Sequence, residues 1–210
     1  MFVGDGLGGY DGGRIASQTA AMAIKDFRKQ YGLLNDECMV TAAEVADDAV
    51  KNQQMIRKAN MKTTMVVLEI DHGNARWMHV GDSRLYHFQK NRIVHQTMDH
   101  SVSQVAVLMG EISQNEIRFH EDRNRVLRAL GSENAKPEIS PLKNLEEDSV
   151  FLLCTDGFWE YVYENEMEET LETSSSPEEW LDKMSRLLEG RVPDGNDNYT
   201  AAAVFYNNEK

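Results

Sequence analysis

The chain contains few cysteines, few prolines and no long hydrophobic run. Its 210 residues include 2 cysteines, Cys38 and Cys154, which are far apart and have no paired spacing. This argues against a disulfide framework and favours a reduced, cytoplasmic protein. No apolar run approaches the roughly 18 residues that a membrane helix needs, and the first residues do not resemble a signal peptide. We therefore expect no membrane partner.

Basic residues are also scarce. The chain has 22 lysines and arginines against 35 aspartates and glutamates, which gives a formal net charge of −13 at pH 7. Such a balance disfavours nucleic acid as a partner and suits a chain that gathers cations. A solvated acidic surface accounts for most of these carboxylates. The six histidines show no ligand spacing such as His-Glu-x-x-His, so zinc is not expected.

Hydrophobic periodicity predicts helices at both ends of a set of strands. Helices are expected over residues 14–31, over 38–59 with a capping box of Thr41 and Glu44, and after Ser176-Pro177. The expected strands cover residues 63–70, 75–80, 85–89, 92–97, 149–155 and 199–206. Because the strands are short and joined by tight turns, we predict antiparallel pairing, with helices outside two stacked sheets.

Three aspartates stand at the ends of strand-like segments. Asp5 follows the apolar start of the chain, Asp156 follows 149–155, and Asp197 precedes the last strand. Carboxylates that converge on one point repel one another unless a cation lies between them. Octahedral oxygen sites of this kind suit Mg²⁺ and Mn²⁺, and Gly6 would let a backbone carbonyl approach as a further ligand. The sequence therefore predicts a divalent-metal site.

These residues have two other interpretations. Gly4-x-Gly6-x-x-Gly9 matches the dinucleotide fingerprint, but Asp5 would oppose a pyrophosphate and no strand–helix–strand unit follows, so we disfavour it. Each Asp-Gly pair taken alone is most simply an ordinary turn. Only their recurrence at the ends of strands favours the metal site.

The same segments resemble motifs of the bacterial metal-dependent protein phosphatases, the type 2C family. The resemblance extends over nearly the whole chain, in the order and spacing of the family. The similar segments are Val3–Ser17, Val80–Tyr86 (Val-Gly-Asp-Ser-Arg-Leu-Tyr), Thr97–Ser101 (Thr-Met-Asp-His-Ser), Gly110–Ile112 with Arg123–Gly131, Leu152–Trp159 and Asp197–Thr200.

The resemblance implies an α+β fold, a four-layer α-β-β-α sandwich with two antiparallel sheets, as a single phosphatase-like domain over 1–210. It implies hydrolysis of phosphoserine and phosphothreonine by a metal-bridging hydroxide, with Mn²⁺ or Mg²⁺ as two ions and a possible weaker third. Residues 102–130, expected to be helical, would form a flap over the site. The implied partner is a phosphorylated substrate of a serine/threonine kinase, and we expect a monomer.

The resemblance also implies roles for individual residues. Asp5 would bridge both metals and the Gly6 carbonyl would bind one of them. Asp156 and Asp197 would complete the other, and Asp99 would offer a third site together with Asp156. We assign Asp82 and Arg84 to structure.

The chain departs from the family pattern near its start. Family members carry one or two strands before the first Asp-Gly motif, which hold a phosphate-binding arginine, and we expect this chain to lack them. Leu7 and Tyr10 occupy positions where family members of the animal and bacterial types have histidine, so the general acid is unassigned. We expect metal binding with weak catalysis. The alternative is an inactive relative that binds phosphoprotein or a regulatory partner.

Overall fold

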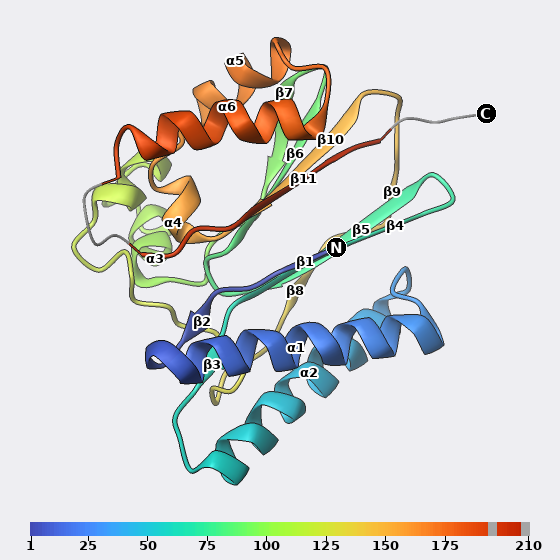
Figure 1. Ribbon diagram of the computed structural model, residues 1–210, viewed down its shortest axis with the longest axis vertical. Helices are drawn as coiled ribbons and strands as arrows, with labels where there is room; N and C mark the ends of the chain where they lie inside the picture. Colours follow the sequence, from blue (N-terminus) through green and yellow to red (C-terminus); the bar gives the residue numbers. More distant parts are fainter. Residues whose placement is uncertain (193–196, 207–210) are drawn as a thin grey trace. The chain divides into compact units, whose positions relative to one another are not determined.

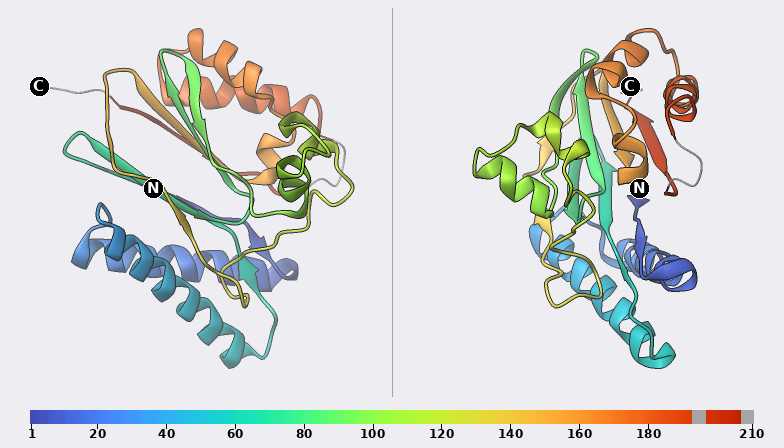
Figure 2. Two further views of the ribbon diagram at one scale, coloured as in Figure 1. Left: turned by 180° about the vertical axis from the view of Figure 1, so that it is seen from behind. Right: turned by 90° about the vertical axis from the view of Figure 1, so that its left-hand side faces the viewer.

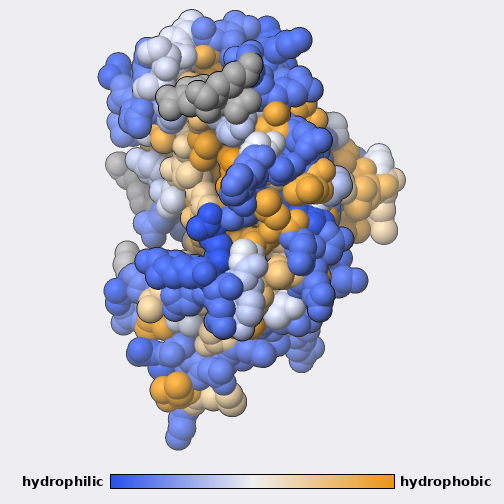
Figure 3. Space-filling view, turned by 90° about the vertical axis from the view of Figure 1, so that its right-hand side faces the viewer, coloured by the Kyte–Doolittle hydropathy of each residue, from blue (hydrophilic) through white to orange (hydrophobic). Residues whose placement is uncertain are grey.

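The computed structural model describes residues 1–192 and 197–206 and divides into two compact units. The first unit comprises Met1–Ser83 and Met98–Lys143, and the second comprises Arg84–Thr97 and the described part of Asn144–Lys210. Within the described residues, no helix has the length and apolar character required to cross a membrane. Hydrophilic side chains cover much of the face drawn in Figure 3, as the acidic composition led us to expect. That the chain acts as one domain stays a prediction.

The first unit is built on an antiparallel sheet. Its strands lie in the order β1 (Phe2–Val3), β4 (Met65–Asp71), β5 (Asn74–Val80) and β8 (Glu138–Ile139), and β9 (Lys143–Asn144) also pairs with β5. The β4–β5 hairpin turns through His72 and Gly73, both with positive φ, which confirms the turn predicted between these strands.

Two long helices cover one face of this sheet, α1 (Gly9–Tyr31) and α2 (Asp36–Arg57), as Figures 1 and 2 show. Small residues on their facing sides let the helices approach each other and the sheet closely. The buried core combines Ala16, Ala20 and Ile24 of α1, Met39, Ala42, Ala43, Ala46 and Val50 of α2, and Met65, Val67, Met78 and Val80 of the strands. Burial of this apolar surface is the main force that holds the helices on the sheet.

Both helices begin earlier than predicted. The helix expected from residue 14 begins at Gly9, and its first turns contain glycines that pack against the preceding strand. The helix expected from residue 38 begins at Asp36, where the Asn35 side chain accepts a hydrogen bond of 2.7 Å from the backbone N–H of Cys38. The capping box of Thr41 and Glu44 is therefore wrong, because both residues lie inside α2.

The segment 102–130, expected to be helical, is only partly so. It contains α3 (Val102–Leu108) and a short 3₁₀ helix, η1 (Gln114–Phe119), and the rest consists of turns. Gly110 ends α3 with a φ of 76°, a conformation that favours glycine. The segment belongs to the first unit, as does the two-stranded sheet of β2 (Gly6–Leu7) and β3 (Lys62–Thr63).

The second unit has its own antiparallel sheet. The strand order is β11 (Ala201–Phe205), β10 (Ser149–Cys154), β6 (Arg84–Gln89) and β7 (Arg92–Gln96), so the fully buried β10 is a central strand as predicted. Lys90 and Asn91 both adopt positive φ in the β6–β7 turn, which confirms the predicted hairpin. The α+β class is therefore confirmed.

Three helices accompany this second sheet: α4 (Asp156–Trp159), α5 (Glu164–Glu172) and α6 (Pro177–Glu189). Trp180 of α6 is fully buried and attaches the helix to the sheet, with ring centroids 5.1 Å from Phe88 and 5.9 Å from Phe205. The Ser176 hydroxyl accepts from the backbone N–H of Glu179, so the predicted cap of this helix is confirmed.

Candidate metal centre

Asp156 and Asp197 of the second unit are brought together by strand pairing. Asp156 is the first residue of α4, immediately beyond β10, and Asp197 lies four residues before β11. The two strands are antiparallel neighbours, with Cys154 opposite Ala201. The end of β10 therefore lies beside the segment that leads into β11. As a result, carboxylate oxygens of the two aspartates lie within 4.8 Å of each other.

Local hydrogen bonds fix these two carboxylates. Asp156 Oδ1 accepts from the backbone N–H of Gly157 at 2.8 Å, and Asp197 Oδ1 accepts from that of Asn198 at 2.8 Å. The segments are also joined where Thr155 N–H donates to the Thr200 carbonyl at 3.0 Å. A Cβ at Gly157 would lie 2.4 Å from the carbonyl oxygen of Asn198, so only glycine allows this close approach.

The donor set fits a hard divalent cation. Two carboxylates this close are unfavourable unless a positive charge or a proton compensates them. Asp197 is exposed and Asp156 is half-buried, so a hydrated ion could reach both. Mg²⁺ and Mn²⁺ favour carboxylate oxygens and retain several waters.

Asp5 and Gly6 lie in the first unit, between β1 and β2, where backbone contacts hold the loop. The backbone N–H of Asp5 donates to Thr64 Oγ1, and its carbonyl accepts from the Thr64 N–H and the Thr63 hydroxyl, each at 2.8 Å. A Cβ at Gly6 would lie 2.2 Å from the carbonyl of Gly13, so a side chain is excluded there. Neither threonine could be found from the sequence, because nothing local links Thr63 or Thr64 to Asp5.

The hydrogen bonds of the Asp5 loop extend to the Gly81-Asp82-Ser83 turn. Thr64 Oγ1, which accepts from Asp5, lies 2.6 Å from the hydroxyl of Ser83. Asp82 is buried at 3% exposure in the same turn. Asp99, the predicted third-site ligand, is also buried in the first unit, and its backbone N–H donates to the Gln104 side chain. Its pairing with Asp156 stays a prediction.

A second group of possible ligands comprises His79, His100 and Glu138 of the first unit. The two rings stack with centroids 4.6 Å apart. Burial lowers the pKa of His79 and lowers that of His100 to about 3, so both are neutral at pH 7. The His100 Nδ1 accepts from the Gly81 N–H at 3.1 Å, and its Nε2 lies 3.3 Å from a guanidinium nitrogen of Arg128 and 3.6 Å from Glu138. Both histidines therefore have hydrogen-bond partners within the protein, since His79 Nε2 also lies 2.8 Å from the Met98 carbonyl.

Sequence spacing could not reveal this histidine pair. His79 lies near the end of β5 and His100 lies in the loop before α3. A backbone hydrogen bond from the His100 N–H to the Gly81 carbonyl brings the two segments together at 2.9 Å.

Arg84 of the second unit supports the helix that carries Asp156. Its guanidinium lies 3.4 Å from the ring centroid of Trp159, the last residue of α4, and is only 1% exposed. It also donates to the Tyr86 hydroxyl at 3.1 Å, and that hydroxyl donates to Glu164 at 3.1 Å. Burial raises the pKa of Tyr86 well above its usual range, so the hydroxyl stays a donor. These contacts support the structural assignment of Arg84.

Comparison with known proteins identifies the family. A profile described as protein phosphatase 2C matches residues 1–196. The chain is 30% identical to the serine/threonine phosphatase Stp of Listeria welshimeri, over 99% of this chain and 84% of that protein. The structure resembles the crystal structure of the serine/threonine phosphatase PstP/Ppp of Mycobacterium tuberculosis, with 26% identity and a TM-score of 0.81, over 96% of this chain and 85% of that chain.

A further solved structure is described as the catalytic domain of the phosphatase PstP in complex with two manganese ions. It has 22% identity and a TM-score of 0.80, and the match covers 96% of this chain and 85% of that chain. The family resemblance found in the sequence motifs is therefore confirmed. This chain belongs to the protein phosphatase 2C family of metal-dependent serine/threonine protein phosphatases.

Proposed function

We propose that this phosphatase uses two divalent cations, Mn²⁺ or Mg²⁺, held by Asp5, Gly6, Asp156 and Asp197. The observation that carries the proposal is the Asp156–Asp197 pair, whose carboxylate oxygens lie within 4.8 Å of each other. Membership of a metal-dependent family and the two manganese ions of the PstP structure support the same assignment. A weaker third site would use Asp99 and Asp156.

In this proposal each protein group has a defined task. Asp5 would contribute its carboxylate to both ions, the Gly6 carbonyl would be a ligand of one, and Asp156 with Asp197 would hold the other. When bound, the cations supply Lewis acidity that activates the attacking water and neutralises charge on the phosphoryl group. The Thr63 and Thr64 contacts hold the backbone of Asp5, and therefore the direction of the Gly6 carbonyl, before any ion binds.

The proposed substrate is a phosphoserine or phosphothreonine side chain of a protein phosphorylated by a serine/threonine kinase. In-line attack by water on phosphorus breaks the bond to the serine or threonine oxygen and releases inorganic phosphate, without a covalent enzyme intermediate. We further propose that the protein acts as a cytoplasmic monomer. The segment 102–130 would shape access for the polypeptide.

The test is phosphate release from a phosphothreonine peptide, measured with added Mn²⁺, with EDTA and with the Asp156→Asn variant. We expect hydrolysis that requires the metal and is abolished by the substitution. Metal-independent hydrolysis, or equal rates for the variant, would contradict the assignment of the site. Tight peptide binding with no hydrolysis under any metal condition would favour the alternative, a phosphoprotein-binding relative.

A further inference from the structure

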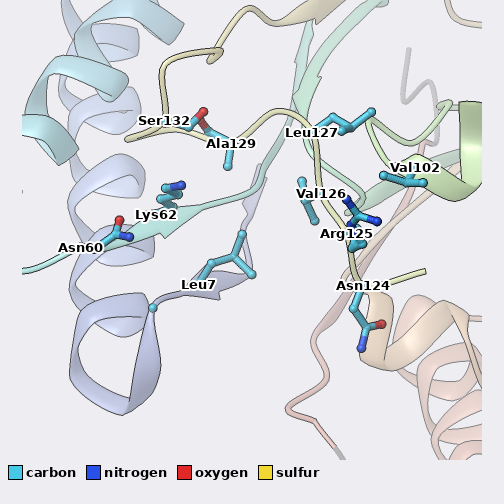
Figure 4. A pocket seen from close by; sticks show the side chains of 11 residues that line it. Leu7, Asn60, Lys62, Val102, Asn124, Arg125, Val126, Leu127, Ala129 and Ser132 are labelled. Carbon is cyan, nitrogen blue, oxygen red and sulfur yellow. The ribbon is translucent and has the colours of Figure 1, made fainter. Parts of the chain in front are cut away.

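The first unit contains a pocket that the proposed catalytic site does not use. Its volume is about 490 Å³, and its lining includes Leu7, Lys62, Val102, Arg125 and Val126. In Figure 4, Leu7 lies at the centre, with Asn60 and Lys62 on one side and Val126 and Arg125 on the other. We call this cavity the Lys62 pocket.

Backbone hydrogen bonds fix the walls of the Lys62 pocket. On one side, Leu7 of β2 pairs with Lys62 of β3. On the other, the N–H of Val102 donates to the Arg125 carbonyl at 3.0 Å, and the N–H of Leu127 donates to the His100 carbonyl at 2.7 Å. The pocket is therefore formed before a ligand arrives, which lowers the entropic cost of binding.

The charge of the pocket is opposite to that of the chain. Its lining includes two cations, Lys62 and Arg125, and no carboxylate, although the chain carries a net charge of −13. The Lys62 ammonium makes no ion pair with other described residues of its unit. Arg125 pairs with Asp122 at 3.1 Å, but its side chain is 68% exposed. Leu7, Val102 and Val126 add an apolar wall beside these cations.

The pocket adjoins the loop that carries Asp5. Leu7 follows Asp5 by two residues, a separation of at most about 7 Å along the chain. Strand β3, which supplies Lys62, continues into Thr63 and Thr64, the residues that hold the Asp5 backbone. Side chains two residues apart on an extended peptide are separated by about the same distance, roughly 7 Å. A peptide with its phosphorylated residue at Asp5 could therefore place a neighbouring side chain in the pocket.

We propose that the Lys62 pocket binds an acidic side chain of the substrate, a glutamate or aspartate within two residues of the phosphorylated residue. The carboxylate pairs with Lys62 and Arg125, and the methylene groups contact Leu7 and Val126. This inference rests on the proposed function and narrows its substrates to phosphopeptides with acidic flanks. Lys62 and Arg125 bind substrate and take no part in the reaction itself.

The test compares two phosphothreonine peptides that differ only in having glutamates or glutamines at the flanking positions. For the wild-type protein we expect kcat/KM to favour the glutamate peptide about fivefold, mainly through KM, as suits a half-exposed charge pair. Lys62→Gln is expected to bring this ratio close to one. Lys25→Gln removes the same charge from an exposed lysine of α1 outside the pocket and should keep the preference.

p-Nitrophenyl phosphate, which has no flanking residues, separates the two levels of the proposal. Suppose that p-nitrophenyl phosphate is hydrolysed in a Mn²⁺-dependent way. If the wild-type protein then shows no preference for the glutamate peptide, or if that preference survives in Lys62→Gln, the pocket assignment alone is overturned. Absence of all turnover would instead contradict the proposed function. In that case the pocket is tested by calorimetry, which measures the affinity of both peptides for the Asp156→Asn variant. Tighter binding of the glutamate peptide that is lost in the Asp156→Asn, Lys62→Gln double variant supports the pocket assignment. Equal affinities of the two peptides for Asp156→Asn refute it.

Discussion

The two units contribute to the proposed metal centre in different ways. In the second unit, pairing of β10 with β11 places two like-charged side chains within 4.8 Å, and the cation-binding property lies in the carboxylates. In the first unit, Asp5 and Gly6 are held through their backbone by Thr63, Thr64 and the close approach of Gly13. We therefore expect metal binding to be sensitive to loss of charge at the carboxylates of the second unit, and to added side-chain volume in the Asp5–Gly6 loop of the first unit.

The largest effect is expected from Asp156→Asn. Loss of this proposed ligand should lower Mn²⁺-dependent hydrolysis of p-nitrophenyl phosphate by more than about a hundredfold, since even loss of an outer-shell partner costs 10–100-fold. Without metal, the variant should be at least as stable as the wild type because one of two repelling charges has been removed. Asp182→Asn, which removes an exposed carboxylate of α6, is the matched control and should keep full activity. A variant of Asp156 that retains activity would contradict this account.

Arg84→Met tests the support beneath Asp156. The substitution removes the stacking on Trp159 and the hydrogen bond to Tyr86, and should lower the free energy of unfolding by about 2–3 kcal/mol. Urea unfolding gives this value. Arg92→Met removes exposed pairs with Glu168 and Glu172, which solvent screens, so its loss of stability should be much smaller. Equal losses in the two variants would show that burial of Arg84 adds nothing.

Gly6→Ala tests the volume sensitivity of the first unit. The added methyl group would meet the Gly13 backbone at 2.2 Å, and we expect a loss of about 1–3 kcal/mol in unfolding free energy together with weaker Mn²⁺ binding. In Gly190→Ala the nearest atoms lie at 3.6 Å, so that control should be close to neutral. Unchanged stability and metal affinity in Gly6→Ala would contradict the backbone role of this residue.

The smallest effect concerns Glu179 at the start of α6. A hydrogen bond from the Ser175 N–H, with Lys183 and the Ser175 hydroxyl, lowers the pKa of this carboxyl to about 2. Because the folded pKa lies below the unfolded one, the stabilisation is complete above about pH 4.5 and is lost as the pH falls towards 2. Glu179→Gln should slightly lower the melting temperature at pH 7, and the difference should vanish near pH 2. A difference that persists there would be inconsistent with this assignment.

Local patterns were sufficient to predict much of the fold. The β4–β5 and β6–β7 hairpins, the central strand β10 and the cap of α6 each depend on residues adjacent in sequence. The start of α2 was missed because its capping residue, Asn35, lies in a loop outside the apolar pattern. The segment 102–130 was misjudged because its long-range bonds, such as Val102 to Arg125, replace helical ones.

The sequence also led to the pairing of Asp156 with Asp197, which the structure places within 4.8 Å of each other, while their role as metal ligands stays a prediction. Asp156 and Asp197 could be found because each stands at the end of a recognisable strand, and neighbouring antiparallel strands bring such ends together. The sequence could not reveal the roles of Thr63 and Thr64 or the stacked pair of His79 and His100. Their partners are distant in sequence, so the spacing of residues does not indicate these contacts.

Calorimetric titration with Mn²⁺ tests the central claim most directly. We predict two ions per chain for the wild type, with binding lost or strongly weakened in Asp5→Asn, Asp156→Asn and Asp197→Asn, and unchanged in Asp182→Asn. Identical binding curves for the wild type and the three site variants would contradict a metal centre built from these aspartates.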